Sequence, residues 1–255
     1  MTAVSLSIVL PAFNEEGCIE ECVKRCLVSG ERLASALEVI VVDDGSSDET
    51  RRIVTGLSAA DPRVRTLHHA KNRGYGAALK SGLFAARHEL VFFTDADLQF
   101  DIGQLAELMQ HAREYGIVAG YRAPRRDPWH RRFNGWAWSR LVGMIFGLGV
   151  RDVDCAFKLF DRRIFEQIEL VSLGAFVNTE ILVRARAAGF SCIEVPVSHY
   201  PRMVGHQSGA NVRVILRAFR ELWLLWTELR GLRRSSEAPP RSAQHGDQNR
   251  GSHQN

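Results

Sequence analysis

The sequence lacks the features that mark membrane-spanning, secreted and nucleic-acid-binding proteins. It contains no uninterrupted apolar run of about 18 residues, so no transmembrane helix is predicted. Its first residues carry no basic segment and no small-residue cleavage site, so no signal peptide is predicted. The formal net charge of +4 over 255 residues is too small to indicate a nucleic-acid partner. We therefore expect a cytoplasmic protein.

Cysteine is scarce, with five residues in the chain. Cys18, Cys22 and Cys26 recur every four residues, a spacing that places them on one face of a helix. A metal site on that face would need a further ligand, but no histidine or fourth cysteine stands at ligand spacing. We interpret the three cysteines as reduced, buried thiols that line a core-facing stripe.

The N-terminal half alternates short apolar runs with longer amphipathic stretches. This pattern is typical of parallel strands joined by crossover helices. We expect an α/β fold with a Rossmann-like, doubly wound, mostly parallel sheet and helices on both faces. The expected strands are 5–10, 38–42, 64–68, 90–94 and 117–120, and the expected helices are 15–27, 48–60, 76–87 and 102–115.

The second half begins after Tyr121 with a segment rich in arginine and tryptophan. We expect a helix, a hairpin, a helix, a strand and a final helix over 133–148, 152–160, 179–188, 192–199 and 211–229. The final helix carries two tryptophans and several arginines, which suits either the bilayer interface or packing against the core. A single domain over 1–234 and a disordered polar tail over 235–255 are predicted.

Acidic residues follow the apolar run 90–94 directly. Strand alternation sends the carboxylates of Asp95 and Asp97 to the same side, and Gln99 follows one further step along. Such oxygen donors suit Mg²⁺ or Mn²⁺, which complete their coordination with phosphates and water. An Asp-x-Asp pattern alone also fits a solvated turn, but its position after a buried strand favours the metal site.

Two further loops are expected at the carboxyl ends of strands, where open α/β sheets bind their ligands. Asp43 and Asp44 can accept from ribose hydroxyls or a base N–H, with a simple strand-to-helix turn as the alternative. Phe13 can contact a base, and Glu15 can accept its donors. The glycine-rich stretch 72–78 follows the third strand and has Leu79 in place of the final glycine, which argues against a dinucleotide-binding dehydrogenase.

Four ordered stretches resemble the family 2 glycosyltransferases, and among them the dolichol- or polyprenyl-phosphate mannose synthases. They are PAFNEE from Pro11, VIVVDDGSSDET from Val39, NRGYGAALKSG from Asn72 and FTDADLQF from Phe93. The resemblance continues through DCAFKLF, Thr179-Glu180 and EVPV to Arg202 and Gly205, and covers roughly residues 5 to 210.

The resemblance implies a GT-A fold and inverting transfer of a hexose from a nucleotide-sugar to a polyprenyl or dolichyl phosphate. Mannose is favoured and glucose is the alternative, so the donor would be of the GDP-mannose or UDP-glucose type. Residues 5–121 would then bind the donor and residues 122–234 the acceptor. The resemblance implies that the nucleotide is bound by Pro11, Phe13, Glu15, Asp43, Asp44, Asp95 and Ala96, and that the metal is bound by Asp95, Asp97 and Gln99. It implies that the catalytic residues are Asp97, Arg202 and Glu180. It implies that the acceptor phosphate is bound by Arg122, Arg132, Lys158 and Arg202.

Two features depart from the family's pattern. Arg202 and Gly205 are followed by Gln207-Ser208-Gly209 without the lysine usual there, which puts one phosphate contact in doubt. Some members carry C-terminal transmembrane helices, and this sequence shows none, so we expect peripheral contact with the inner face of the membrane.

Three hypotheses about activity remain open. Residues 122–140 contain six arginines and three tryptophans, which suits a lipid phosphate that approaches along a membrane surface. A lipid phosphate is already ionised and needs no general base, whereas a saccharide hydroxyl would need one, either Glu180 or Asp154. The third hypothesis is a degenerate domain that binds nucleotide or membrane without turnover, against which the intact acidic motif argues.

Overall fold

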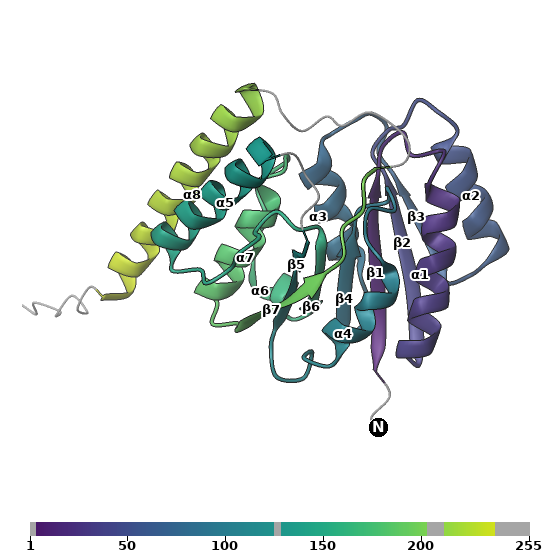
Figure 1. Cartoon of the computed structure of the whole chain (residues 1–255), viewed down its shortest axis with the longest axis horizontal. Helices are drawn as coiled ribbons and strands as arrows, with labels where there is room; N and C mark the ends of the chain where they lie inside the picture. Colours follow the sequence, from purple (N-terminus) through teal and green to yellow (C-terminus); the bar gives the residue numbers. More distant parts are fainter. Residues whose placement is uncertain (1–3, 125–128, 203–211, 238–255) are drawn as a thin grey trace, which may run out of the picture.

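A computed structural model describes residues 4–124, 129–202 and 212–237 as one seven-stranded mixed sheet with helices around it (Figure 1). The strand order is β3-β2-β1-β4-β6-β5-β7. All neighbouring strands are parallel except β6, which is antiparallel to both β4 and β5. The strands are β1 (Ser5–Ala12), β2 (Ala36–Asp43), β3 (Val64–His68), β4 (Leu90–Thr94), β5 (Ile117–Arg122), β6 (Phe157–Asp161) and β7 (Cys192–Val197). The expected mostly parallel α/β sheet is confirmed.

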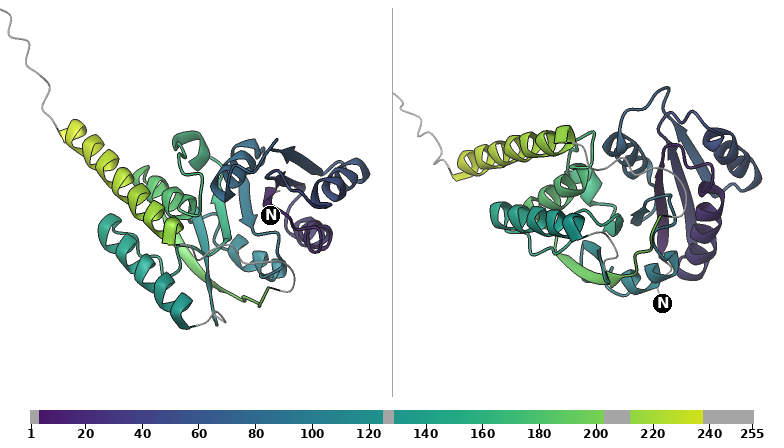
Figure 2. Two further views of the ribbon diagram at one scale, coloured as in Figure 1. Left: turned by 90° about the horizontal axis from the view of Figure 1, so that it is seen from above. Right: turned by 45° about the horizontal axis from the view of Figure 1, so that its top comes forward.

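The helices cover both faces of the sheet. The chain winds outward from β1 to β3 and then returns across β1 to β4, so α3 lies on the face opposite α1 and α2. At the other end, α5 and α8 lie beside each other, away from α1 and α2 (Figure 2). The helices are α1 (Ile19–Leu33), α2 (Thr50–Ala60), α3 (Tyr75–Ala85), the 3₁₀ helix η1 (Ile102–Gln104), α4 (Leu105–Met109), α5 (Trp129–Phe146), α6 (Ile164–Gln167), α7 (Val177–Ala187) and α8 (Val212–Glu237).

Three expectations from the sequence need correction. The hairpin expected over 152–160 is wrong, because only residues 157–161 form a strand, and this strand is inserted between β4 and β5. The first four residues of this strand are all buried, Lys158 among them, so the strand lacks the alternation of apolar and polar residues that distinguishes a hairpin arm. The helix expected over 102–115 is broken into η1 and the short α4. The final helix extends to Glu237, past the expected start of the tail at Ser235, and 238–255 lie outside the described residues.

The core is a continuous layer of apolar side chains around the central strands. Most of β1 and β2 is buried, as expected for strands with helices on both faces. Phe92 of β4 meets Phe157 of β6 edge-on at 4.7 Å between ring centroids. Cys18, Cys22 and Cys26 are buried, as predicted. This packing fixes β1, β2 and β4 beside one another, so their carboxyl ends form one rigid edge.

Candidate functional site

Three loops meet at the carboxyl ends of β1, β2 and β4. The register pairs Ala12 with Asp43 and Val9 with Phe93, so the residues that follow each strand emerge at one level. Hydrogen bonds tie the first two loops together, since the backbone N–H of Asn14 donates to Ser46 Oγ at 3.0 Å and that of Glu15 to Thr50 Oγ1 at 2.8 Å. The predicted switch-point edge is therefore assembled from the segments that carry the acidic and aromatic candidates.

Arg202 joins two carboxylates that come from different loops. Its Nη2 lies 2.5 Å from Glu15 Oε1, and its Nη1 lies 3.5 Å from Asp97 Oδ2. Burial raises the pKa of Glu15 although Arg202 opposes the shift. Burial also raises the pKa of Asp97, against a backbone hydrogen bond from Gln99 and the charge of Arg202. Glu15 and Arg202 are 187 positions apart in sequence, and the fold places them in direct contact.

Asp95 belongs to the same site and has one buried oxygen, although the residue as a whole is partly exposed. Its Oδ1 is buried and, among the described residues, has no hydrogen-bond partner. Burial, followed by the negative charge of Asp97, raises the pKa of Asp95 to about 7. Two carboxylates held this close in a poorly hydrated position favour binding of a cation, because a cation relieves both the burial cost and the mutual repulsion.

Gln99 contributes less to the site than its sequence position indicates. Its Nε2 donates to the carbonyl of Tyr200 at 3.0 Å, which leaves Oε1 as its side-chain oxygen for a metal. Together with the carboxylates of Asp95 and Asp97, this gives a small set of hard oxygen donors that suits Mg²⁺ or Mn²⁺. Over residues 4–124, 129–202 and 212–237, no group of three His, Cys, Asp or Glu side chains is arranged to hold a metal ion. The residues therefore fit a cation that shares its coordination with a bound diphosphate.

The two aspartates at the end of β2 are already held by the protein. Asp43 accepts from the Ser46 N–H at 2.9 Å and from Arg51 Nε at 2.9 Å, and His68 Nδ1 lies 3.1 Å away. Although burial opposes it, these contacts lower the pKa of Asp43, so this carboxylate is ionised. Such a fixed negative charge at the strand end can accept a base N–H or a ribose hydroxyl.

Asp44 braces the neighbouring loop. It accepts from the backbone N–H groups of Arg73 and Gly74 at 2.9 and 2.8 Å, and its Oδ1 lies 2.6 Å from His69 Nδ1. Gly74 has φ of 101°, a conformation that side chains disfavour, and it is the residue immediately before α3. Asp44 is therefore placed to shape the glycine-rich loop, and its predicted contact with the nucleotide remains a prediction.

The remaining nucleotide candidates differ in exposure. Phe13 is 44% exposed, so its ring is available to a base. Pro11 and Ala96 are buried, and each can contribute only backbone atoms or shape to the site.

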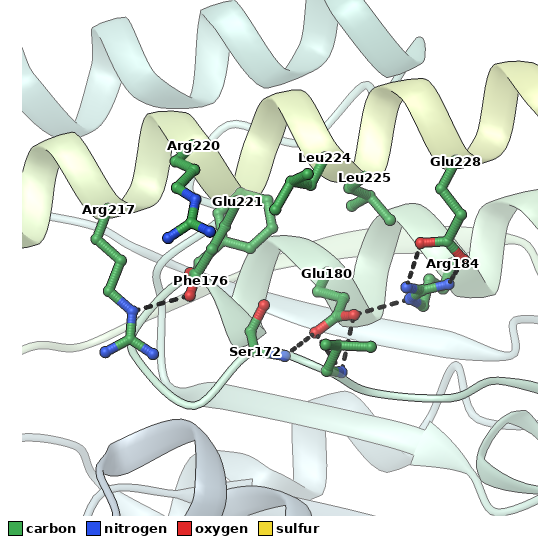
Figure 3. Close-up of a pocket in the computed structure, with 11 residues that line it drawn as sticks. Ser172, Phe176, Glu180, Arg184, Arg217, Arg220, Glu221, Leu224, Leu225 and Glu228 are labelled. Atoms are coloured by element: carbon green, nitrogen blue, oxygen red, sulfur yellow. Dashed lines mark hydrogen bonds and ion pairs between the residues drawn. The ribbon is translucent and has the colours of Figure 1, made fainter.

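Glu180 is enclosed by hydrogen bonds (Figure 3). Its carboxylate accepts from the backbone N–H groups of Val171 and Ser172 and from Arg184 Nε, with distances between 2.8 and 3.1 Å. Arg184 also pairs with Glu228 of α8. Through these contacts Glu180 holds the segment before α7 in place. Glu180 also lines a pocket of about 350 Å³ between α7 and α8. Its contacts do not favour its use as a general base.

The cations assigned to the acceptor phosphate are not gathered at one point. Arg122 makes two bonds with Asp152, at 2.7 and 2.8 Å. Arg132 lies on the exposed surface of α5. Lys158 is 1% exposed and donates to the carbonyls of Val153 and Cys155, so its position gives no access to a phosphate. Arg202 is the cation that the structure brings beside the acidic motif, while Gly205 and 207–209 lie outside the described residues.

Two residues near Asp95 were missed by the sequence reasoning. Tyr75 begins α3 and Asn178 lies in the first turn of α7, and both have side-chain oxygens buried beside Asp95. Tyr75 stands inside the glycine-rich stretch 72–78, which was considered in the sequence as a dinucleotide-binding fingerprint and as part of the family resemblance. Asn178 immediately precedes Thr179-Glu180, but its type alone does not distinguish a buried amide from a capping residue.

The comparisons with known proteins identify the family to which the chain belongs. The model of the family described as "Glycosyl transferase family 2" matches residues 7–169. A glycosyltransferase named AglD from Haloferax volcanii is 36% identical over 236 residues, which cover 89% of this chain and 38% of that protein. A dolichyl-phosphate β-glucosyltransferase from Trichomonas vaginalis is 33% identical, covering 76% of this chain and 63% of its own length. The chain thus spans less than two thirds of these relatives.

Solved structures show a similar fold. Glucosyl-3-phosphoglycerate synthase from Mycobacterium tuberculosis, in complex with Mn²⁺ and UDP-glucose, superposes with a TM-score of 0.64 at 19% identity. The match covers 89% of this chain and 79% of that one. At this identity the likeness concerns the fold, and it confirms the expected GT-A architecture.

Proposed function

Because the chain belongs to glycosyl transferase family 2, we propose that it transfers a hexose from a nucleoside-diphosphate sugar to a polyprenyl or dolichyl phosphate, with inversion at the anomeric carbon. Binding of the nucleotide-sugar donor is supported by the cluster of Glu15, Asp97 and Arg202 at the carboxyl ends of β1 and β4. The lipid phosphate is supported by a relative named for a dolichyl phosphate and another, 29% identical, named for an undecaprenyl phosphate. The sugar is mannose by preference, with glucose as the alternative.

The donor would lie along the edge formed by the three loops. Phe13 would stack against the base, and Asp43 would accept from the base or the ribose. Asp95, Asp97 and the Oε1 of Gln99 would hold Mg²⁺ or Mn²⁺, which when bound supplies positive charge to the departing diphosphate. Arg202 would contribute a second cation at the same point, and its contacts with Glu15 at 2.5 Å and Asp97 at 3.5 Å support this role.

The state of Glu180 argues against one of the two candidate bases for a hydroxyl acceptor, the other being Asp154, and in this respect favours a lipid phosphate. A phosphate oxygen is already anionic near neutral pH, so the protein has only to hold it in line with the anomeric carbon. A hydroxyl would need a base, but the carboxylate of Glu180 is occupied by two backbone N–H groups and Arg184. Arg202 is proposed to meet the acceptor phosphate, with Arg122 and Arg132 along its approach.

The exposed aromatic faces of α5 and α8 support an approach from a membrane. Trp129, Phe133 and Trp136 of α5 are 78%, 58% and 59% exposed, and Trp223 of α8 is 61% exposed. Aromatic rings with neighbouring arginines suit the headgroup region of a bilayer. No described helix is long and apolar enough to cross a membrane. We propose that α5 and α8 rest on the cytoplasmic membrane surface and receive the lipid there.

The experiment is transfer of labelled sugar from GDP-mannose or UDP-glucose to a short-chain polyprenyl phosphate, with Mn²⁺ or with EDTA. The proteins compared are wild type, Asp97→Asn and a control, Asp61→Asn, which changes a carboxylate at the opposite end of the sheet. We expect product that requires both the metal and Asp97 and that survives the control substitution. A β-linked product from an α-linked donor demonstrates inversion.

Other outcomes would replace parts of the proposal. Donor binding without any lipid product would overturn the lipid acceptor and direct the search to saccharides. Absence of donor binding would favour a domain without turnover. Full activity in EDTA would remove the metal from the proposed mechanism.

Co-sedimentation with vesicles that contain anionic lipid tests the proposed membrane surface. The double variant Trp129→Ser/Trp223→Ser should no longer co-sediment, whereas the control Phe84→Ser should do so as wild type does. Unchanged co-sedimentation of the double variant would exclude this surface.

A further inference from the structure

Three buried side-chain oxygens meet next to the acidic motif, and each comes from a different element. They are the hydroxyl of Tyr75 on α3, Asp95 Oδ1 after β4 and Asn178 Oδ1 on α7. The Tyr75 hydroxyl interacts with the side chains of both Asp95 and Asn178. Within the described part of the chain, none of the three oxygens has a hydrogen bond of standard geometry. Buried polar atoms in this state are uncommon and need an explanation.

The elements that carry these atoms are firmly held against one another. The N–H of Gly76, in the first turn of α3, donates to the carbonyl of Leu173 at 3.0 Å. A Cβ atom at Gly76 would lie 2.6 Å from the carbonyl oxygen of Gly174, so the backbone of α3 touches the segment that leads into α7. This contact fixes Tyr75 relative to Asn178. The backbone packing therefore holds the three oxygens in a fixed arrangement.

The chemistry of the cluster indicates a role in orienting Asp95. A phenol is a donor and an acceptor, a carboxylate only accepts, and an amide does both. A small rotation about Asp95 would allow the Tyr75 hydroxyl to donate its single proton to Oδ1, and Asn178, with its amide turned over, would then donate from Nδ2 to the hydroxyl oxygen. Oδ1 would be held inward, and the other oxygen of Asp95 would be directed to the cation. Groups behind metal ligands commonly act in this way, by fixing the orientation of the ligand.

We propose that Tyr75 and Asn178 are positioning residues that hold Asp95 in the orientation needed to bind the divalent cation. The inference rests on the proposed function, because it needs the metal at Asp95. It adds that the acceptor half takes part in binding the donor's metal, since Asn178 belongs to α7. Trp138 of α5 donates to Thr179 Oγ1 at 3.2 Å, so the turn that carries Asn178 is also held by α5.

The test is a titration of Mn²⁺ binding in the presence of UDP or GDP, followed by the electron paramagnetic resonance signal of free Mn²⁺. The variants are Tyr75→Phe, which removes only the hydroxyl, Asn178→Leu, which removes only the amide, and the double variant. Tyr115→Phe is the control, because it removes the same hydroxyl at the amino end of β5, on the far side of the sheet. A steady-state assay measures the KM for the acceptor in parallel.

We expect each single variant to weaken Mn²⁺ binding by roughly tenfold, in the range found for residues behind metal ligands, with the acceptor KM unchanged. The double variant should weaken binding by less than the product of the two single effects, because the residues act through one carboxylate. Tyr115→Phe should bind as wild type does. Asn178→Ser serves as a second variant if Asn178→Leu does not fold.

A Kd for Mn²⁺ within twofold of wild type, in both Tyr75→Phe and the Asn178 variant, would overturn this inference and leave the proposed function standing. Multiplicative effects in the double variant would overturn it as well, because the two side chains would then act separately. Absence of Mn²⁺ binding in wild type, even with nucleotide, would instead remove the metal from the proposed function.

Discussion

Replacing Arg202 with methionine tests whether this side chain neutralises the acidic site. The change removes a charged hydrogen bond to Glu15 and a longer contact to Asp97, and all three side chains are less than one fifth exposed. A charged hydrogen bond contributes about 1.5–3 kcal/mol, and the longer contact adds about 0.5–1 kcal/mol. We expect the free energy of unfolding at pH 8 to fall by roughly 2–4 kcal/mol, measured by urea denaturation without metal.

The loss should depend on pH in a defined direction. The folded-state pKa of Glu15 is already above its usual 4.5, so the folded protein binds its proton more tightly than the unfolded chain does. Stability from such a group is present at low pH and is lost as pH rises from 4.5 toward the folded-state pKa. Without Arg202 this pKa rises further, so Arg202→Met should be more damaging at pH 8 than at pH 5. Equal losses at both pH values would refute the reasoning.

A matched control separates this effect from a general loss of charge. Arg25 also pairs with a glutamate, Glu21, at 2.7 Å, but both side chains are about half exposed. Exposed pairs of this kind contribute little, so Arg25→Met should change the free energy of unfolding by less than about 0.5 kcal/mol at either pH. Addition of Mn²⁺ should recover part of the stability lost in Arg202→Met, because the cation would replace the missing charge at Asp97.

Three further substitutions test the edge of the sheet. Asp44→Asn should lower the free energy of unfolding by about 1–3 kcal/mol, because it disturbs a buried acceptor of three hydrogen bonds, and should weaken nucleotide binding in a fluorescence titration. Gly45→Ala should lower the melting temperature, because φ is 73° and the new Cβ would lie 2.5 Å from the backbone of Lys71; an unchanged melting temperature would contradict this geometry. Phe157→Ala should cost about 3–5 kcal/mol in urea denaturation, as its ring packs against Phe92 in the core, and a loss below 1 kcal/mol would show that the cavity closes.

The sequence predicted the first half of the fold well because its strands follow a strong local pattern. The bounds of β3 and β4 agree with the predicted ranges to the residue. For β4 the reason is local, because LVFFT is a short apolar run between polar residues. β6 was misplaced because a strand inserted between two others from sequence-distant segments leaves no local signal of its neighbours. The same limit applies to the site: Asp95 and Asp97 were visible as a pattern, whereas their meeting with Arg202 depends on the chain's return past β7.

The two cations Lys158 and Arg202 show why a residue's type does not reveal its role. Both are basic and both lie in stretches that resemble the family, so the sequence reasoning assigned both to the acceptor phosphate. Lys158 lies on a strand covered on both faces, and burial lowers the pKa of its ammonium group. This group donates to the carbonyls of Val153 and Cys155 and lies over the ring of Phe93. Arg202 lies beyond the last strand, where two carboxylates from other loops reach it. What separates them is the set of partners across the sheet, which tertiary packing determines.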